Sequence, residues 1–136
     1  MNADATGRFE GDLGSPAQAR ALVRQALAAW DCDDLDDVAS LLTTEVVANA
    51  VRYAADQIAL RVSLDDDVVR VEVHDTNPVL PEGRRVARGA TSGRGLQVVE
   101  ALAQRWGAHR QGTGKIVWFE IAARGQPSEG SGNNPF

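Results

Sequence analysis

The stretch Thr44-Glu45-Val46-Val47-Ala48-Asn49-Ala50-Val51-Arg52-Tyr53-Ala54 sets two polar side chains into a largely apolar run. Glu45 and Asn49 are four residues apart, which places both on one helix face, one turn apart. Such a pair among valines and alanines is costly unless something uses it. The pair therefore predicts a site in which Asn49 binds Mg²⁺ and Glu45 acts as general base. The alternative is an amphipathic helix edge on which Glu45 pairs with Arg52.

Hydrophobic periodicity around this stretch predicts a helix over about residues 34–55. An earlier helix over about residues 16–30 begins at Ser15-Pro16, where serine can cap free N–H groups and proline fits the first turn. A third helix, over about residues 95–106, follows a glycine turn.

Two hairpins complete the pattern. Residues 58–64 and 69–75 alternate between apolar and polar side chains around the turn Asp65-Asp66-Asp67. Residues 107–111 and 115–122 form the second pair. We expect an α+β two-layer sandwich, with three helices on one face of a mixed, mostly antiparallel sheet of four or five strands.

The domain is expected over residues 15–123, after a flexible N-terminus of residues 1–14 and before a disordered tail of residues 124–136. The chain has 136 residues, 43% of them hydrophobic, and a net charge of -5. This acidic balance argues against direct nucleic-acid binding. The single cysteine, Cys32, excludes an internal disulfide, and without a signal peptide or membrane span we expect a cytoplasmic protein.

Two further segments carry candidate ligand groups. Asp75 ends a valine-rich strand, where its carboxylate could accept hydrogen bonds from an exocyclic amine and a water, or simply start a turn. Gly93-Arg94-Gly95 precedes the third helix, whose free N–H groups could bind an anion. Arg84, Arg85 and Arg88 lie before that turn and could neutralise phosphates as a loop closes.

The order of these features resembles the GHKL ATPases, which include gyrase, a heat-shock chaperone ATPase, histidine kinases and mismatch-repair proteins. Within that family the chain looks like the anti-sigma-factor serine kinase branch, in its short actinobacterial form. The matching stretches are Thr44–Ala54, Val71–Asp75, Gly93–Val99, Ala103–Gly107 and Gly114–Glu120. The resemblance implies a Bergerat-type ATP-binding fold.

The same resemblance implies a role for each matching residue. Glu45 looks like the general base that activates a substrate serine, and Asn49 looks like the Mg²⁺ ligand. Asp75 looks like the adenine reader, and Gly93 and Gly95 look like the phosphate-side turn. Other ATP-binding positions expected on this basis are Asn77, Arg84, Arg94, Leu96 and Thr113.

By resemblance, the chain is a serine protein kinase that uses ATP and Mg²⁺. Relatives of this kind phosphorylate a STAS-type anti-anti-sigma protein, and many sequester a sigma factor. They often form dimers, so a homodimer is also expected.

Two departures from the family pattern affect the adenine side. The run Asp75-Thr76-Asn77-Pro78 replaces the usual D-x-G-x-G, and Ile116 stands where many relatives have a threonine that supports the aspartate. Loss of one such hydrogen bond costs on the order of 1 kcal/mol. These departures favour a second hypothesis, a GHKL-fold binding module that acts by protein docking with little or no catalysis. A histidine kinase ATPase half is a third reading, but it would need a phospho-acceptor helix pair.

Overall fold

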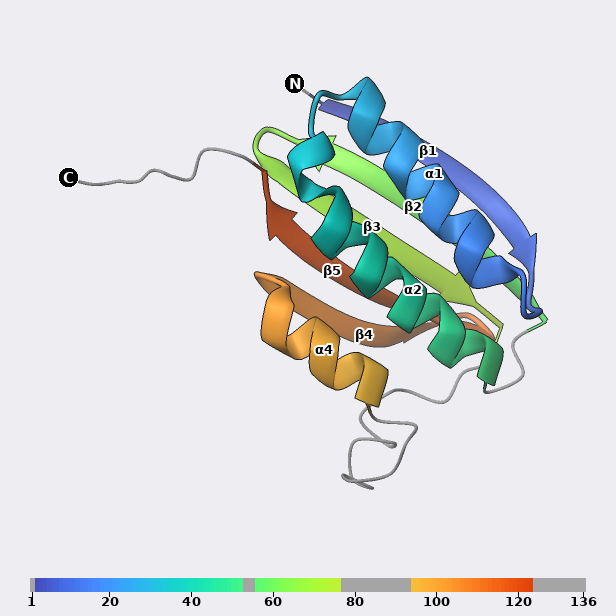
Figure 1. Cartoon of the computed structure of the whole chain (residues 1–136). Helices are drawn as coiled ribbons and strands as arrows, with labels where there is room; N and C mark the ends of the chain where they lie inside the picture. Colours follow the sequence, from blue (N-terminus) through green and yellow to red (C-terminus); the bar gives the residue numbers. More distant parts are fainter. Residues whose placement is uncertain (1, 53–55, 77–93, 124–136) are drawn as a thin grey trace.

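The computed structural model describes residues 2–52, 56–76 and 94–123 of the chain. In these residues, one sheet is covered on one face by helices (Figure 1). The strands are β1 (Asn2–Glu10), β2 (Gln57–Asp65), β3 (Val68–Asp75), β4 (Arg105–Gln111) and β5 (Gly114–Ala122). The helices are α1 (Ser15–Ala29), α2 (Asp36–Arg52) and α4 (Arg94–Leu102), with a short 3₁₀ turn η1 (Asp33–Leu35).

The five strands follow the order β1-β2-β3-β5-β4, and all four described pairings are antiparallel. The predicted two-layer α+β sandwich is thus confirmed, with an antiparallel sheet where a mixed one was expected. Both predicted hairpins are present. Asp66 adopts a positive φ of 55° in the first turn, and Gly112 adopts 61° in the second.

The N-terminal segment corrects one prediction. Residues 1–14 showed no hydrophobic periodicity, yet residues 2–10 form strand β1, which pairs with β2 along its whole length. Its inward positions include Ala5 and Phe9, which pack against the core. Small inward residues give a weak apolar signal, while pairing to β2 satisfies the backbone hydrogen-bonding groups of the strand.

The helix boundaries differ from prediction at several ends. Ser15 is the first residue of α1 and makes no N-cap hydrogen bond; its hydroxyl donates to the carbonyl of Glu10. Helix α2 begins two residues later than expected, because Asp33–Leu35 form η1. Helix α4 ends at Leu102, and Trp106 instead lies in β4 opposite Phe119. Residues 53–55 lie outside the described residues, so the expected end of α2 at residue 55 is untested.

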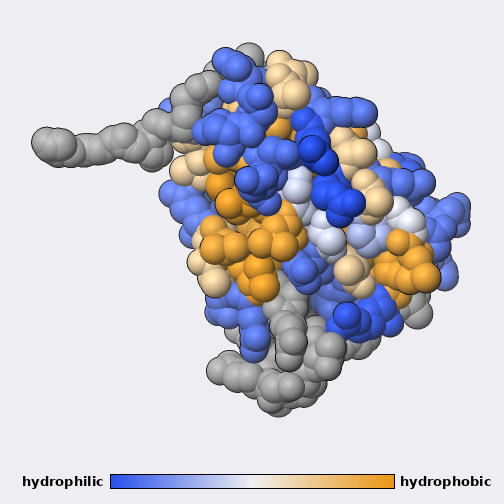
Figure 2. Space-filling model, viewed as in Figure 1, coloured by the Kyte–Doolittle hydropathy of each residue, from blue (hydrophilic) through white to orange (hydrophobic). Residues whose placement is uncertain are grey.

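The core lies between the helices and the sheet. Alternate residues of β2, β3 and β5 point to the helices, as shown by Val71, Val73 and Phe119, which are fully buried. Figure 2 shows the helix-covered side of the molecule, which is mostly hydrophilic with apolar areas. Among the described residues, the exposed large apolar side chains are Leu13, Leu41 and Leu102. No described helix has the length and apolar character that a membrane crossing requires.

Candidate functional site

Parts of four elements lie together at one end of the sandwich. The C-terminal half of α2, the end of β3, the start of β5 and the start of α4 lie there together (Figure 1). Helix α2 packs against both α4 and β3. Strands β3 and β5 are antiparallel, so the last residue of β3 and the first residues of β5 lie at the same end of the sheet.

Glu45 and Asn49 lie on α2, as predicted, within Asp36–Arg52. Asn49 is 7% exposed, and within the described residues no hydrogen bond reaches its amide. Glu45, one turn earlier, is half-buried. The Asn49 amide is not among the fully buried polar atoms that lack a hydrogen-bond partner in the described residues, so it keeps some access to solvent and is open to a ligand at this end of α2.

Asp75 is the last residue of β3 and lies directly opposite Lys115, the second residue of β5. The Lys115 Nζ lies 3.0 Å from Oδ1 and 2.9 Å from Oδ2 of Asp75. Both side chains are 1% exposed. The predicted adenine reader is therefore already held in a buried ion pair.

Lys115 is the site residue that sequence reasoning missed. Ile116 was predicted to stand at the position that supports Asp75, but it pairs with His74, which puts it on the sheet face opposite to that of Asp75. The residue that supports Asp75 is Lys115. A signal was present, because Lys115 is the only lysine in the chain and the hairpin register brings it across from Asp75.

The turn between β4 and β5 closes around the end of β3. Thr113 lies exposed in that turn, at the same end as Asp75. A Cβ atom at Gly114 would overlap the carbonyl oxygen of Asp75, so only glycine allows this approach of β5 to β3. On the other side, Thr76 accepts a hydrogen bond from the Asp56 N–H at 2.8 Å. The position of Asp75 is thus fixed by contacts on both sides.

The structure describes only part of the segments that are predicted to bind the phosphates. The predicted third helix is present as α4, but it begins at Arg94, inside the predicted Gly93-Arg94-Gly95 turn, so Gly95 and Leu96 lie in its first turn. Asn77, Arg84 and Gly93 lie outside the described residues. Their roles in phosphate and base binding stay predictions.

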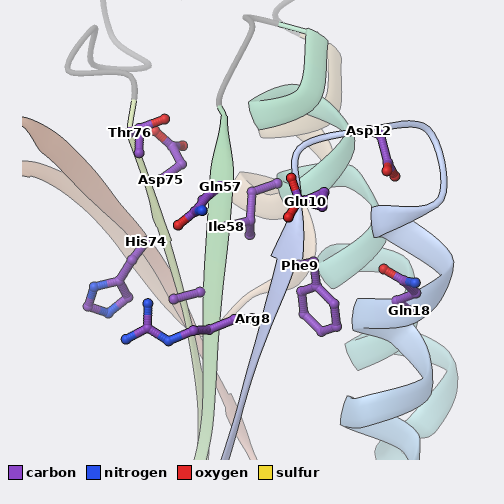
Figure 3. A pocket seen from close by; sticks show the side chains of 11 residues that line it. Arg8, Phe9, Glu10, Asp12, Gln18, Gln57, Ile58, His74, Asp75 and Thr76 are labelled. Atoms are coloured by element: carbon purple, nitrogen blue, oxygen red, sulfur yellow. The ribbon is translucent and has the colours of Figure 1, made fainter.

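A cavity of about 660 Å³ lies beside Asp75. Figure 3 shows Asp75 and Thr76 at its upper end, with His74 and Arg8 on one side of the strands and Phe9 on the side of α1. Neither Glu45 nor Asn49 lines it. This cavity is therefore separate from the part of α2 that carries Glu45 and Asn49.

The donor atoms present fit Mg²⁺ only together with phosphate oxygens. Among the described residues, no group of three or more His, Cys, Asp or Glu side chains could hold a metal alone. Mg²⁺ commonly takes one or two protein oxygens plus substrate phosphates and water. The Asn49 amide oxygen, for which the described residues show no hydrogen bond, fits that requirement.

The sheet face away from the helices carries a separate charge network. Arg70 donates to Glu72 at 2.7 Å and to Glu120 at 2.9 Å, and its guanidinium lies 4.1 Å from the Trp118 ring centre. Burial acts to raise the pKa of Glu72, but hydrogen bonds from Arg70 and His74 outweigh it and lower that pKa. This network stabilises the outer face and does not reach the helix-side groups.

Residues 9–121 match the family model described as "Histidine kinase-like ATPase domain". The chain belongs to this family. The resemblance drawn from the E-x-x-x-N helix, Asp75 and the glycine turn is thereby confirmed at the family level. As a histidine kinase-like ATPase domain, the chain is an ATP-binding domain, and the candidate site lies inside the matched residues.

Two solved structures share the fold of this histidine kinase-like ATPase domain. The RsbU and RsbW domains of Rv1364c from Mycobacterium tuberculosis match with a TM-score of 0.67 at 20% identity, over 89% of this chain and 32% of that one. The histidine kinase domain of the Erythrobacter litoralis EL346 blue-light activated histidine kinase matches with a TM-score of 0.52 at 28% identity, over 67% of this chain and 46% of that one. No curated protein sequence matches the chain. The chain thus spans less than half of either solved protein.

Proposed function

We propose that this histidine kinase-like ATPase domain is an anti-sigma-factor serine protein kinase. It would bind ATP with Mg²⁺ and transfer the γ-phosphate to a serine of a STAS-type anti-anti-sigma protein. The observation that carries the proposal is Asn49, which is 7% exposed and has no hydrogen-bond partner in the described residues, one turn from Glu45. In an ATP-binding domain, this amide would act at the metal and phosphate end of the nucleotide.

The two residues of α2 would divide the chemistry. Glu45 accepts the proton of the substrate serine while the serine oxygen attacks the γ-phosphorus. The bond between that phosphorus and the β–γ bridging oxygen breaks, and ADP leaves with the electron pair. Asn49 would hold Mg²⁺, and the ion would neutralise charge on the phosphate oxygens. The start of α4 adds free N–H groups on the phosphate side.

The partners proposed for this kinase are proteins. Leu41 precedes Glu45 by one helical turn on α2, and Leu102 lies on the neighbouring α4; their exposed fractions are 42% and 48%. These apolar side chains favour protein docking near Glu45, by the anti-anti-sigma substrate and by a sequestered sigma factor. A homodimer remains part of the proposal, and the net charge of -5 disfavours nucleic acid.

A second candidate is a binding module without turnover. It is favoured by the Asp75 carboxylate, whose two oxygens both contact Lys115 Nζ. In that case an adenine base could bind Asp75 only by sharing the carboxylate with Lys115 or by displacing Lys115 from it. The module would then act by docking its regulators.

The kinase proposal is tested with purified protein, ATP, Mg²⁺ and the STAS-domain proteins of the source organism. Phosphoserine is measured by mass spectrometry. Glu45→Gln should slow transfer by about 10²- to 10⁴-fold, the usual contribution of a general base. Glu100→Gln is the matched control, because Glu100 is an exposed carboxylate on α4. Absence of phosphoserine from every candidate, or equal transfer by Glu45→Gln, would contradict the kinase proposal.

Titration calorimetry separates the two candidates. The kinase requires ATP binding with a Kd below about 100 μM, and this binding should weaken when Mg²⁺ is removed. The docking module predicts weak or absent nucleotide binding, together with a stable complex with its regulator when no nucleotide is present.

A further inference from the structure

The helix-side register between β3 and β5 is apolar until its last pair. Val69 faces Ile121, Val71 faces Phe119, and Val73 faces Val117. These six side chains are all buried. The next pair in the same row is Asp75 with Lys115, and it is equally buried.

This change from apolar to ionic pairing calls for an explanation beyond stability. A buried ion pair is often no better for stability than an apolar pair of similar volume. A fourth apolar pair would continue the core at this position. The ion pair instead places a charge at the edge of the candidate nucleotide site, beside the Gly114 backbone.

The geometry of the pair determines what Asp75 can offer a ligand. Lys115 Nζ lies within hydrogen-bond distance of both carboxylate oxygens, at 3.0 and 2.9 Å. A carboxylate so held is an acceptor only, and each oxygen has a second acceptor site. The Lys115 ammonium group orients both oxygens, so the direction in which Asp75 can accept a further hydrogen bond depends on Lys115.

We propose that Lys115 is a positioning residue that holds Asp75 as an acceptor and thereby sets the base preference of the nucleotide site. The role rests on the proposed function, because it requires that the chain bind ATP. An acceptor-only Asp75 favours a purine with an exocyclic amine at position 6. It disfavours one with a carbonyl there, because two acceptors then face each other.

ATP and ITP test this role, since they differ at position 6 of the base. Calorimetry on the wild type should show ATP bound more tightly than ITP by about 10- to 100-fold, the range of one charge-assisted hydrogen bond. Lys115→Gln keeps a polar side chain and removes the charge. It should reduce this ATP-to-ITP ratio by about tenfold or more. A purely structural role would weaken both nucleotides alike and leave the ratio unchanged.

Two further variants complete the experiment. Lys115→Arg restores the cation and should restore the ratio. Arg61→Met removes a cation of β2 that forms a half-exposed ion pair with Asp4 of β1, and it should keep the wild-type ratio. Circular dichroism confirms folding, and if Lys115→Gln does not fold, Asp75→Asn tests the same point, because its neutral amide donates as well as accepts and should also lower the ratio.

Two negative results of this experiment would have different meanings. A wild type that binds neither nucleotide overturns the proposed function and this role with it. A wild type that prefers ATP, with Lys115→Gln or Asp75→Asn showing the same preference, overturns the role of Lys115 alone.

Discussion

Asp75 and Lys115 face each other across β3 and β5, and each side chain of this ion pair is 1% exposed. The surrounding pairs in the same row are apolar. Because the pair is buried, water cannot take the place of either side chain. Removal of one charge therefore destabilises the other.

We predict that Lys115→Met lowers the free energy of unfolding by about 3–5 kcal/mol, because it removes the cation from the buried Asp75 carboxylate. The double variant Lys115→Met/Asp75→Leu should recover most of this loss, since an apolar pair continues the row. Urea denaturation followed by circular dichroism measures both. As a control, Arg61→Met breaks a half-exposed pair and should cost less than about 1 kcal/mol. A double variant as unstable as the single one would show that the ion pair is not the source of the loss.

Asn49→Ala should weaken ATP binding in the presence of Mg²⁺ by about tenfold or more, because it removes an oxygen ligand to a charged group. In EDTA the wild type and the variant should bind ATP with similar affinity. Titration calorimetry under both conditions gives the comparison. Gln25→Ala, which removes an exposed amide from α1, is the matched control and should change neither value. Equal loss with and without Mg²⁺ would argue against a role at the metal.

Gly107→Ala should destabilise the β4–β5 hairpin. A Cβ atom at this position would lie 2.8 Å from Cζ2 and 2.9 Å from Cε2 of Trp118, so the indole ring would have to shift. We expect a loss of about 1–3 kcal/mol in thermal or urea denaturation. In a Trp118→Val background the same change should cost much less. Gly14→Ala is the control, because its nearest contact, Asp12 Oδ1, is at 3.4 Å.

The free energy of unfolding at acid pH should show how much Glu72 contributes to stability. Its pKa in the folded chain lies below the ordinary value of 4.5, so its ion pairs stabilise the fold above that pH. This stability is lost as the pH falls through the lower folded value. The difference in unfolding free energy between wild type and Glu72→Gln should therefore shrink below about pH 4.5. A difference that stays constant from neutral pH to acid would contradict the assignment.

Much of the architecture could be predicted because it rests on local patterns. Alternating apolar residues predict β2 and β3, and the helical spacing of leucine, valine and alanine predicts α1 and α2. Strand β1 was missed, because Ala3, Ala5 and Gly7 carry little hydrophobic signal. Helix α4 was extended too far, because Trp106 fits a helical spacing as well as it fits a strand that faces Phe119.

The sequence by itself determined the family, because the order of the motifs along the chain carries it. It also placed Glu45 and Asn49 on one face of α2, because their spacing lies within one helix. Only the tertiary structure decided which residue supports Asp75. That choice depends on the register between two strands forty residues apart, and a slip of one residue turns every side chain to the other face. The register sets Lys115 against Asp75 and sends Ile116 to the face opposite the helices. A buried ion pair at the base-reading end of the site is the result.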